Sequence, residues 1–386
     1  MALDGTNREQ AFWYHHAVAD MMLLCLLFGQ ANGIVFSSQF RNRLESMLEF
    51  IAAVMDAGGH VPMVGDADDA VMVRLSREPE FCPYRSLLAT GAVLFGRSDF
   101  KFKAGRLDDK SRWLLGNETA QRFDALPARA AKPRHAFPDG GYWILGDHFG
   151  TPEEIKLVAD AGPLGYLSLA AHGHADALAF TLSVGGREIL IDPGTYAYHT
   201  QKPWRDYFRG TSAHNTVRVD GVDQSVAGGN FLWLKHARAT CERFESTPER
   251  DEWIAMHDGY QRLPDPVTHW RTIHFEKKSG QVRILDRLEC RKTHRIELFW
   301  HAAEACDVKK ENGPVTFLND GVTLSMTMEE LAWRPQLISG QEDPPLGWIS
   351  RRFDQKTPST TVVWCGEIRG TTQLLTLIRI RIRNPL

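Results

Sequence analysis

Cysteine is scarce in this 386-residue sequence, and the six cysteines that occur are scattered along it. None of them forms a Cys-x-x-Cys pair, the spacing typical of cysteine zinc clusters and redox motifs. A disulfide-stabilised scaffold needs a much higher density of cysteine in a much shorter chain. Both a disulfide framework and a cysteine zinc cluster are therefore poorly supported.

An excess of charge of one sign is also lacking. The chain has 45 basic and 48 acidic residues, which gives a net charge of −3. A nucleic-acid-binding chain typically carries a strong basic excess, so we expect no nucleic-acid partner, and an anionic ligand would need a local cationic site. Hydrophobic residues make up 43% of the chain, which is enough for a large core and too much for a disordered protein.

A long hydrophobic run is absent as well. The longest apolar stretch, residues 21–29, is well short of the roughly 20 residues that a membrane-spanning helix needs. The segment before it carries Asp4, Glu9 and Asp20 instead of the short basic lead of a signal peptide. We therefore expect no membrane span and a buried helix at this position.

The N-terminal third of the chain has apolar residues at helical spacing. The spacing predicts helices over residues 9–27 and 40–57, the second ending at a Gly-Gly pair, with shorter helices over 83–95 and 111–126. Residues 128–138 contain two prolines and four basic residues, a composition typical of a linker.

After this linker the hydrophobic period changes to two. Residues 179–192 read as two strands around Gly185-Gly186, a strong hairpin signal. Further strands are predicted over 215–220, 269–275, 281–288, 295–300 and 374–383. The fold class is therefore α+β and multidomain, with a helical domain over 1–127, a linker over 128–140 and a large antiparallel β-sandwich over 141–386.

The densest group of polar residues lies between His172 and His214. His172 and His174 form a His-x-His pair, and alternate residues of an extended chain lie on one face. Asp192 at the end of a hairpin strand and the third histidine, His214, complete a mixed nitrogen and oxygen set that Zn²⁺ accepts. The alternative is that these histidines are hydrogen-bonded polar residues at the edge of a sheet.

A second group lies near the start of the chain. On a helix, Asn7, Gln10 and Tyr14 share one face. A tyrosine whose pKa is lowered toward neutrality by nearby cations can transfer protons. Taken alone, a tyrosine at such a position more often packs in a core or an interface.

Four segments together resemble a known family. They are residues 172–198 (HGHADALAFTLSVGGREILIDPGTYAY), 204–217 (WRDYFRGTSAHNTV), 7–16 (NREQAFWYHH) and 55–69 (MDAGGHVPMVGDADD). The sequence resembles the heparinase II/III-like polysaccharide lyases over nearly its whole length. This resemblance implies an incomplete α/α toroid followed by a β-sandwich. It also implies β-elimination on uronate-containing glycans such as glycosaminoglycans, alginate or exopolysaccharides.

The resemblance also implies roles for individual residues. Tyr14 matches the catalytic tyrosine of the family and His172 its catalytic histidine. His174, Asp192 and His214 match the ligands of a zinc ion that is structural in the family. The resemblance thus divides the His-x-His pair between catalysis and metal binding, where spacing alone would give both histidines to the metal.

Other residues are expected to contact the substrate. Glu9 and His15 flank the tyrosine as the family motif expects. Arg205, Tyr207 and Arg209 are candidates for the substrate carboxylate and the glycosidic oxygen, with Tyr207 assigned to catalysis and Tyr198 as a rival second tyrosine. The arginines could instead brace their loop through Asp206 or backbone carbonyls. The aspartates of GDADD (Asp66, Asp68 and Asp69) lack EF-hand spacing, so capping or loop structure is the preferred interpretation.

The family normally carries a longer helical region before the tyrosine motif, including an Asn or Asn-His pair that neutralises the substrate carboxylate. Here the motif begins at residue 7, so we expect a truncated chain with weak activity on its own. The resemblance implies a periplasmic or secreted location. Two alternatives stay open: a module that binds acidic glycans without cleaving them, and a zinc hydrolase.

Overall fold

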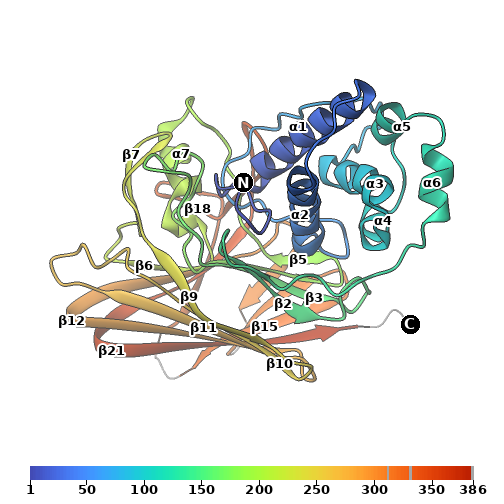
Figure 1. The fold of residues 1–386 in the computed structure, drawn as a ribbon. Coiled ribbons are helices and arrows are strands. Elements are labelled where there is room, and N and C mark those ends of the chain that lie inside the picture. The colour runs from blue at the N-terminus through green and yellow to red at the C-terminus, as the bar shows by residue number, and fades with distance from the viewer. Residues whose placement is uncertain (311–312, 330–332, 384–386) are drawn as a thin grey trace.

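Helices form the N-terminal part of the fold and lie over one face of a β-sandwich (Figure 1). The computed structural model describes residues 1–310, 313–329 and 333–383, so residues 384–386 of the expected sandwich domain lie outside the described residues. The helices of this part are α1 (Phe12–Ala31), α2 (Ser38–Val54), α3 (Pro83–Phe95), α4 (Ser98–Ala104), α5 (Asp109–Leu115) and α6 (Thr119–Ala125).

Local sequence signals set the ends of the helices. The Ser37 side chain accepts a hydrogen bond from the Phe40 backbone N–H and caps α2. Pro83 occupies the first turn of α3, and Gly96 ends this helix in the left-handed conformation that glycine adopts without strain. The helix expected over 111–126 is interrupted at Gly116, which has a φ of 85°, and forms α5 and α6 instead.

The apolar face of α2 packs against α1 and α3 in a helical core. Leu23 of α1, Leu44 and Leu48 of α2 and Leu88 of α3 are all buried there. Helix α1 is long and apolar enough to cross a membrane. Core helices and signal sequences can have the same length and composition. In this fold 44% of that apolar window is buried, and the helix forms part of the core.

A five-stranded antiparallel sheet lies directly beneath the helices (Figure 1). Its strands, in spatial order, are β1 (Ala136–Phe137), β2 (Tyr142–Asp147), β3 (Ile155–Asp160), β4 (Phe180–Val184) and β5 (Arg187–Leu190). The hairpin expected around Gly185-Gly186 is confirmed as β4 and β5. Both glycines have positive φ, as a tight two-residue hairpin turn requires.

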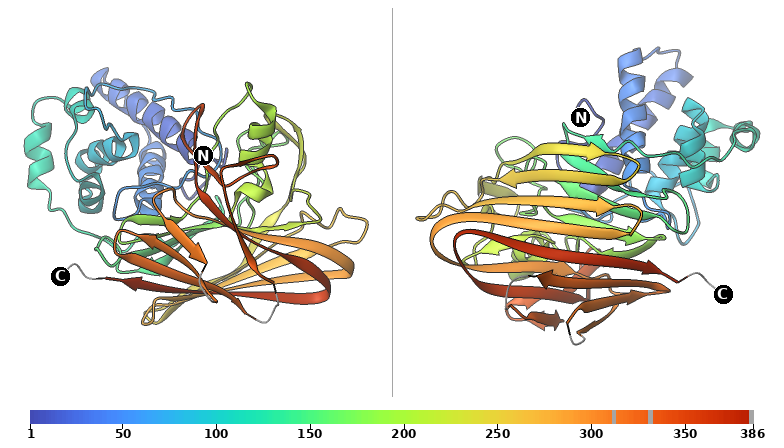
Figure 2. Two further views of the ribbon diagram at one scale, coloured as in Figure 1. Left: turned by 180° about the vertical axis from the view of Figure 1, so that it is seen from behind. Right: turned by 90° about the horizontal axis from the view of Figure 1, so that it is seen from below.

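A ten-stranded antiparallel sheet forms the face away from the helices (Figure 2). Its strands are β6 (Val217–Val219), β9 (Ala239–Ser246), β10 (Arg250–His257), β11 (Thr268–Glu276), β12 (Gln281–His301), β13 (Asp307–Lys310), β14 (Val315–Asn319), β15 (Val322–Glu329), β16 (Pro335–Ser339) and β21 (Thr360–Ile382). The strands expected over 281–288 and 295–300 are one strand, β12, whose register shifts between Glu289 and Thr293.

In the part of the chain that the structure describes, three short hairpins, one further α-helix and a 3₁₀-helix (η1, Thr211–Ala213) lie outside the two sheets. The hairpins pair β7 (Val226–Gly229) with β8 (Leu232–Lys235), β17 (Gln341–Glu342) with β18 (Pro345–Leu346), and β19 (Trp348–Arg352) with β20 (Gln355–Pro358); the helix is α7 (Lys202–Arg209). In Figure 1, α7 and β7 rise beside α1 on the same side of the sandwich.

Two apolar cores hold these layers in place. One lies between the sheets and includes Leu157 and Phe180 of the small sheet and Ile284 of the large one. In the other, Phe12 at the start of α1 packs against Tyr142 of β2, with ring centroids 5.0 Å apart. The first turn of α1 is therefore fixed directly on the sandwich, which places the next residues of this helix beside the sandwich loops.

Candidate active site

Tyr14 lies in the first turn of α1 and faces the sandwich loops. Its hydroxyl donates to Asp68 Oδ2 at 3.2 Å and lies 2.6 Å from the hydroxyl of Tyr198. An ionised carboxylate can only accept hydrogen bonds. The Tyr14 hydroxyl therefore donates its hydrogen bond to Asp68, and the Tyr198 hydroxyl donates to the Tyr14 oxygen. The Tyr14 ring also lies against the His172 imidazole, with ring centroids 4.5 Å apart. Residues from the helical part and from the sandwich thus meet at one partly exposed place.

A single buried carboxylate, Asp66, holds the sandwich side of this site together. It belongs to the segment of the chain that connects α2 to α3, and its side chain is fully buried. Its Oδ2 accepts from His172 Nδ1 at 3.2 Å, and its Oδ1 accepts from His174 Nε2 at 3.0 Å. The Arg205 guanidinium binds both carboxylate oxygens.

The charge state of Asp66 follows from these partners. Burial alone would raise the pKa of Asp66, but the hydrogen bonds from His172 and His174 and the charge of Arg205 outweigh burial. Together they hold the pKa of Asp66 well below its usual range. The carboxylate is therefore ionised and can only accept hydrogen bonds.

This ionised carboxylate fixes the tautomers of both histidines. Each imidazole must donate to Asp66 the N–H that points toward it. A neutral His172 then keeps Nε2 as its unprotonated nitrogen, and a neutral His174 keeps Nδ1. Asp66 thus leaves one imidazole with a free Nε2 for proton transfer and the other with a free Nδ1 for metal coordination.

His174, Asp192 and His214 form a group that could hold a metal ion. One ligand atom from each lies within 4.8 Å of the others, and all three residues are buried. His174 Nδ1 and His214 Nε2 have no hydrogen-bond partner, whereas His214 Nδ1 donates to Asp192 Oδ2 at 3.0 Å. Buried polar atoms without a partner are costly, and a metal ion would satisfy both nitrogens. Two imidazoles and one carboxylate suit Zn²⁺.

A second group of metal-ligand type lies on β12 and the connection before β11, and it has a different character. It comprises Asp265, Cys290 and His294. His294 Nδ1 lies 2.6 Å from Asp220 Oδ2, and His294 Nε2 lies 3.0 Å from Asp265 Oδ2. Burial lowers the pKa of His294, but the two carboxylates outweigh burial and raise it. Each ring nitrogen of His294 is therefore held by a carboxylate, and neither is free for a metal.

Aromatic side chains form one wall of the site. Phe231, at the tip of the β7–β8 hairpin, lies against His172 and Tyr198, with ring centroids 5.8 Å and 5.0 Å away. Phe353 covers the other side of the Tyr198 ring at 4.9 Å. Such a wall offers apolar faces against which the C–H face of a sugar ring can pack.

The two tyrosines are weaker acids than free tyrosine. Burial is the main cause that raises the pKa of both Tyr14 and Tyr198, and the charges of Asp66 and Asp68 add to it. Carboxylates lie beside Tyr14, so its pKa is raised and not lowered toward neutrality. Both phenols keep their protons near neutral pH and can serve as proton donors.

The structure places Tyr207 away from this site. It lies in an apolar cluster with Tyr196, Phe208 and Trp348 and is 5% exposed. The expected catalytic role of Tyr207 is not supported, because its ring packs on the sandwich side of α7. Tyr198, the rival candidate for the second tyrosine, is the one whose hydroxyl lies 2.6 Å from that of Tyr14.

The two arginines of α7 are braces within the protein and do not present open contacts for a substrate. Arg205 is fully buried and divides its donors between Asp66 and the Asn230 carbonyl. Arg209 is 1% exposed and donates to the Gly229 and Asn230 carbonyls. The alternative that these arginines brace a loop is therefore the better interpretation, although the partners are Asp66 and the β7–β8 hairpin rather than Asp206.

The residues that flank Tyr14 also have structural positions. His15 is buried; its Nε2 lies 3.0 Å from the Met47 carbonyl, and its Nδ1 accepts from the Asn7 backbone N–H. Glu9 exchanges hydrogen bonds with Asn7. The expected substrate contact of His15 is therefore excluded in this arrangement, since neither ring nitrogen is free.

Sequence reasoning missed Asp66 and Asp68. Both lie in the GDADD segment, for which the sequence predicts capping or loop structure. The available signal was a cluster of carboxylates in a segment, 55–69, that resembles the family as strongly as the tyrosine motif does. What spacing could not reveal is that this loop crosses to the sandwich, where the Asp66 backbone N–H donates to the His172 carbonyl.

Comparison with known proteins agrees with this fold. Residues 129–376 match the family described as heparinase II/III-like, C-terminal, whereas no curated protein sequence matches the chain. The heparan sulfate lyase HepC from Pedobacter heparinus has a similar structure, with a TM-score of 0.75 at 17% identity over 99% of this chain and 54% of that one. A heparinase III structure matches with a TM-score of 0.72 at 16% identity over 99% of this chain and 55% of that one.

The chain thus spans about half the length of these solved structures. At such low identity they show the shared fold, and the match to the family description covers most of the sandwich. The chain therefore belongs to the heparinase II/III-like family.

Proposed function

We propose that this chain is the site-bearing C-terminal part of a polysaccharide lyase that cleaves uronate-containing glycans by β-elimination. The observation that carries the proposal is the meeting of Tyr14, Tyr198 and His172 at one partly exposed place. A proton acceptor and a proton donor at one place are what elimination needs, because a proton leaves C5 while the leaving oxygen on C4 gains one.

His172 is the proposed base. Its Nδ1 is held by Asp66, so its Nε2 is the nitrogen free to take the C5 proton. The electron pair of the C5–H bond then forms the C4–C5 double bond, and the C4–O bond breaks. The partly exposed His172 side chain, 26% accessible, can reach a bound sugar.

Tyr14 is the proposed acid. Its phenol is protonated near neutral pH and can give its proton to the oxygen that leaves C4. Tyr198, which donates to Tyr14, can return a proton to it, so the pair forms a short relay. Phe231 would pack against the sugar ring and help to exclude water from it.

We further propose that His174, Asp192 and His214 hold a zinc ion with a structural role. The fit rests on the two buried imidazole nitrogens without partners beside a carboxylate. A zinc ion bound there would supply charge and fixed ligand geometry that rigidify the loops beneath the site. Through Asp66, the orientation of His174 is linked to that of His172.

The helices α1–α6 are proposed to be part of the incomplete toroid of the family. The chain spans about half of the related solved structures, and elimination also needs a donor that neutralises the substrate carboxylate as charge develops. We propose that helices outside this chain supply that donor. The chain alone is then expected to be weakly active.

The direct test is product analysis. The chain is incubated with heparan sulfate, chondroitin, alginate and bacterial exopolysaccharides, and the ultraviolet absorbance of unsaturated uronate ends is followed. The proposal expects such ends from at least one polymer and their loss in Tyr14→Phe. Saturated ends would indicate a hydrolase, and retention of a polymer without product would indicate a binding module. No product even after the N-terminal helices of a related lyase are fused to the chain would overturn the proposal.

A further inference from the structure

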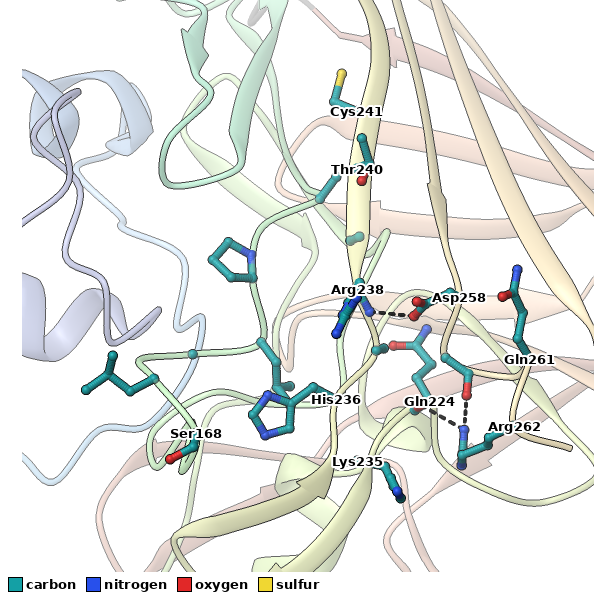
Figure 3. Close-up of a pocket in the computed structure, with 18 of the residues that line it drawn as sticks. Ser168, Gln224, Lys235, His236, Arg238, Thr240, Cys241, Asp258, Gln261 and Arg262 are labelled. Carbon is teal, nitrogen blue, oxygen red and sulfur yellow. Dashed lines mark hydrogen bonds between the residues drawn. The ribbon is translucent and has the colours of Figure 1, made fainter.

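A large open cavity lies on the sandwich beside the candidate active site and is separate from it. Its volume is about 930 Å³, at the upper end of the roughly 300–1,000 Å³ typical of ligand pockets. We call it the lateral groove. It is bordered by residues 163–168, by the chain from the end of β8 into β9, and by the connection between β10 and β11 (Figure 3).

Positive charge dominates the lateral groove. Three of its lining residues, Lys235, Arg238 and Arg262, are cationic, against one carboxylate, Asp258. Lys235 and Arg238 are exposed, and in the part of the chain that the structure describes no carboxylate pairs with either side chain. Two unpaired cations at a concave surface attract an anionic ligand.

Arg262 contributes positive charge in a fixed position. Its guanidinium donates to the backbone carbonyls of Gln224, Gly259 and Asp223, and in the described residues it has no carboxylate partner. Figure 3 shows this side chain held against Gln224 at one end of the groove. The guanidinium is therefore fixed in position by backbone carbonyls, and the charge of the nearby Asp223 carboxylate also acts on it.

The remaining lining suits a sugar. Hydroxyls and amides such as Thr240, Ser168 and Gln261 alternate with apolar side chains such as Leu167 and Leu234. The last two are 71% and 61% exposed. A carbohydrate has hydroxyl edges and apolar C–H faces, so a mixed lining fits it better than it fits a purely apolar ligand. An acidic sugar would in addition meet the cations.

The lateral groove and the candidate active site share a wall. The Trp233 backbone N–H donates to the Leu169 carbonyl, and Trp233 Nε1 donates to the Gly173 carbonyl at 3.0 Å. Strand β8 is thereby fixed to the loop that carries His172. Phe231 precedes this strand on the active-site side, and Lys235 ends it on the groove side.

We infer that the lateral groove is a second binding site, which takes an acidic oligosaccharide through its carboxylate or sulfate groups and holds a polymer beyond the site of cleavage. The choice of a glycan as the anion rests on the proposed lyase function; the anionic character of the ligand does not. Lys235 and Arg238 bind the acidic groups, and the exposed leucines contact the sugar faces.

The test measures binding without turnover. The chain and its Lys235→Gln/Arg238→Gln variant are titrated with a heparan sulfate octasaccharide at two salt concentrations, all in a Tyr14→Phe background. The matched control is Arg379→Gln/Arg381→Gln, which removes the same charge from exposed positions of β21. We expect the groove variant to weaken binding about tenfold, for the loss of two charge-assisted contacts. The control variant should bind as the parent does, and the thermal midpoints of all three should agree.

Each outcome decides a separate point. Equal affinity of the groove variant and the parent would overturn the second site, even if the chain proves to be a lyase. Weakened octasaccharide binding in a chain that yields no unsaturated product would support the site and count against the lyase. The parent could also bind a DNA oligonucleotide of the same charge as tightly as it binds the octasaccharide. If the groove variant lost that binding as well, the assignment of the groove to glycans would be overturned. In an active chain, the groove variant should raise KM for long polymers and leave kcat unchanged.

Discussion

The hydroxyls of Tyr14 and Tyr198 lie 2.6 Å apart, although the two residues are 184 positions apart in the chain. One comes from the first turn of the first helix and the other from the loop after β5. The direction of the hydrogen bond between the two hydroxyls follows from Asp68. Its carboxylate accepts the hydrogen bond that Tyr14 donates, so Tyr198 is the donor to Tyr14. The pair is thus ordered before any substrate arrives.

Removal of the Tyr14 hydroxyl should abolish most of the proposed lyase activity. We expect Tyr14→Phe to lower kcat about 10² to 10⁴-fold, the range for loss of a positioned general acid. Tyr198→Phe should have a smaller effect, because Tyr14 keeps its own proton. Initial rates of unsaturated-end formation measure both.

Tyr207→Phe is the matched control for these two variants. This residue lies in the apolar cluster of α7, so the same change should leave the rate within about twofold of the parent, as expected for a position away from the reacting atoms. A rate loss in Tyr207→Phe equal to that in Tyr14→Phe would contradict the placement of the active site.

Asp66→Asn should damage stability and the site together. The amide cannot balance the buried Arg205 charge, and breaking a buried ion pair costs about 3–5 kcal/mol. It also removes the constraint on the tautomers of His172 and His174. Denaturant unfolding measures the free energy of unfolding. Asp68→Asn is the control, since its carboxylate is partly exposed and should cost less than about 1 kcal/mol. Equal costs for the two variants would contradict the bridging role of Asp66.

The sequence predicts much of the fold because the hydrophobic period changes from helical to alternating along the chain. The bounds of α3 and the turn of the β4–β5 hairpin follow from proline and glycine signals that act locally. Where prediction fails, the deciding interactions are distant. Helix α7 has a polar composition, and its stability comes from buried contacts such as that of Arg205 with Asp66.

The candidate site shows the same limit. The grouping of His174, Asp192 and His214 could be read from spacing and resemblance, and the structure brings the three together. The choice between Tyr207 and Tyr198 could not be made from the sequence. Both tyrosines lie near the same motif, and only the path of the chain after β5 separates them. Asp66 was missed because a buried carboxylate and a surface carboxylate look alike in sequence.

Zinc should copurify with the chain in a one-to-one ratio. We expect His214→Ala and Asp192→Ala to lose the metal, because each removes one of three ligands. Elemental analysis after dialysis gives the zinc content. The thermal midpoint should fall with a chelator in the variants that keep the metal, and should not change in His214→Ala or Asp192→Ala. His294→Ala is the control, since its nitrogens bind two carboxylates. Full zinc content in His214→Ala, or its loss in His294→Ala, would contradict the assignment.

A buried lysine fastens the helical layer to the small sheet. Lys156 of β3 donates through Nζ to the Ala53 and Met55 carbonyls at the end of α2. Burial, followed by the charge of the nearby Lys103, lowers the pKa of Lys156 to about 7. In the unfolded chain a lysine has a pKa of about 10.4. Between these two values the unfolded state binds more protons than the folded state.

Stability should therefore rise with pH across this window through Lys156. The slope reaches about 1.4 kcal/mol per pH unit when the proton difference is one. The measurement is the free energy of unfolding of the parent minus that of Lys156→Met, from about pH 7.5 to 9.5; the subtraction removes the titration of other groups. Lys277→Met is the matched control, because the buried Lys277 ammonium lies 2.9 Å from a carboxylate, that of Asp251. A flat or falling difference for Lys156→Met would show that Lys156 stays charged in the folded protein. The junction of α2 with β3 would then be held by an ammonium ion at the negative end of the helix.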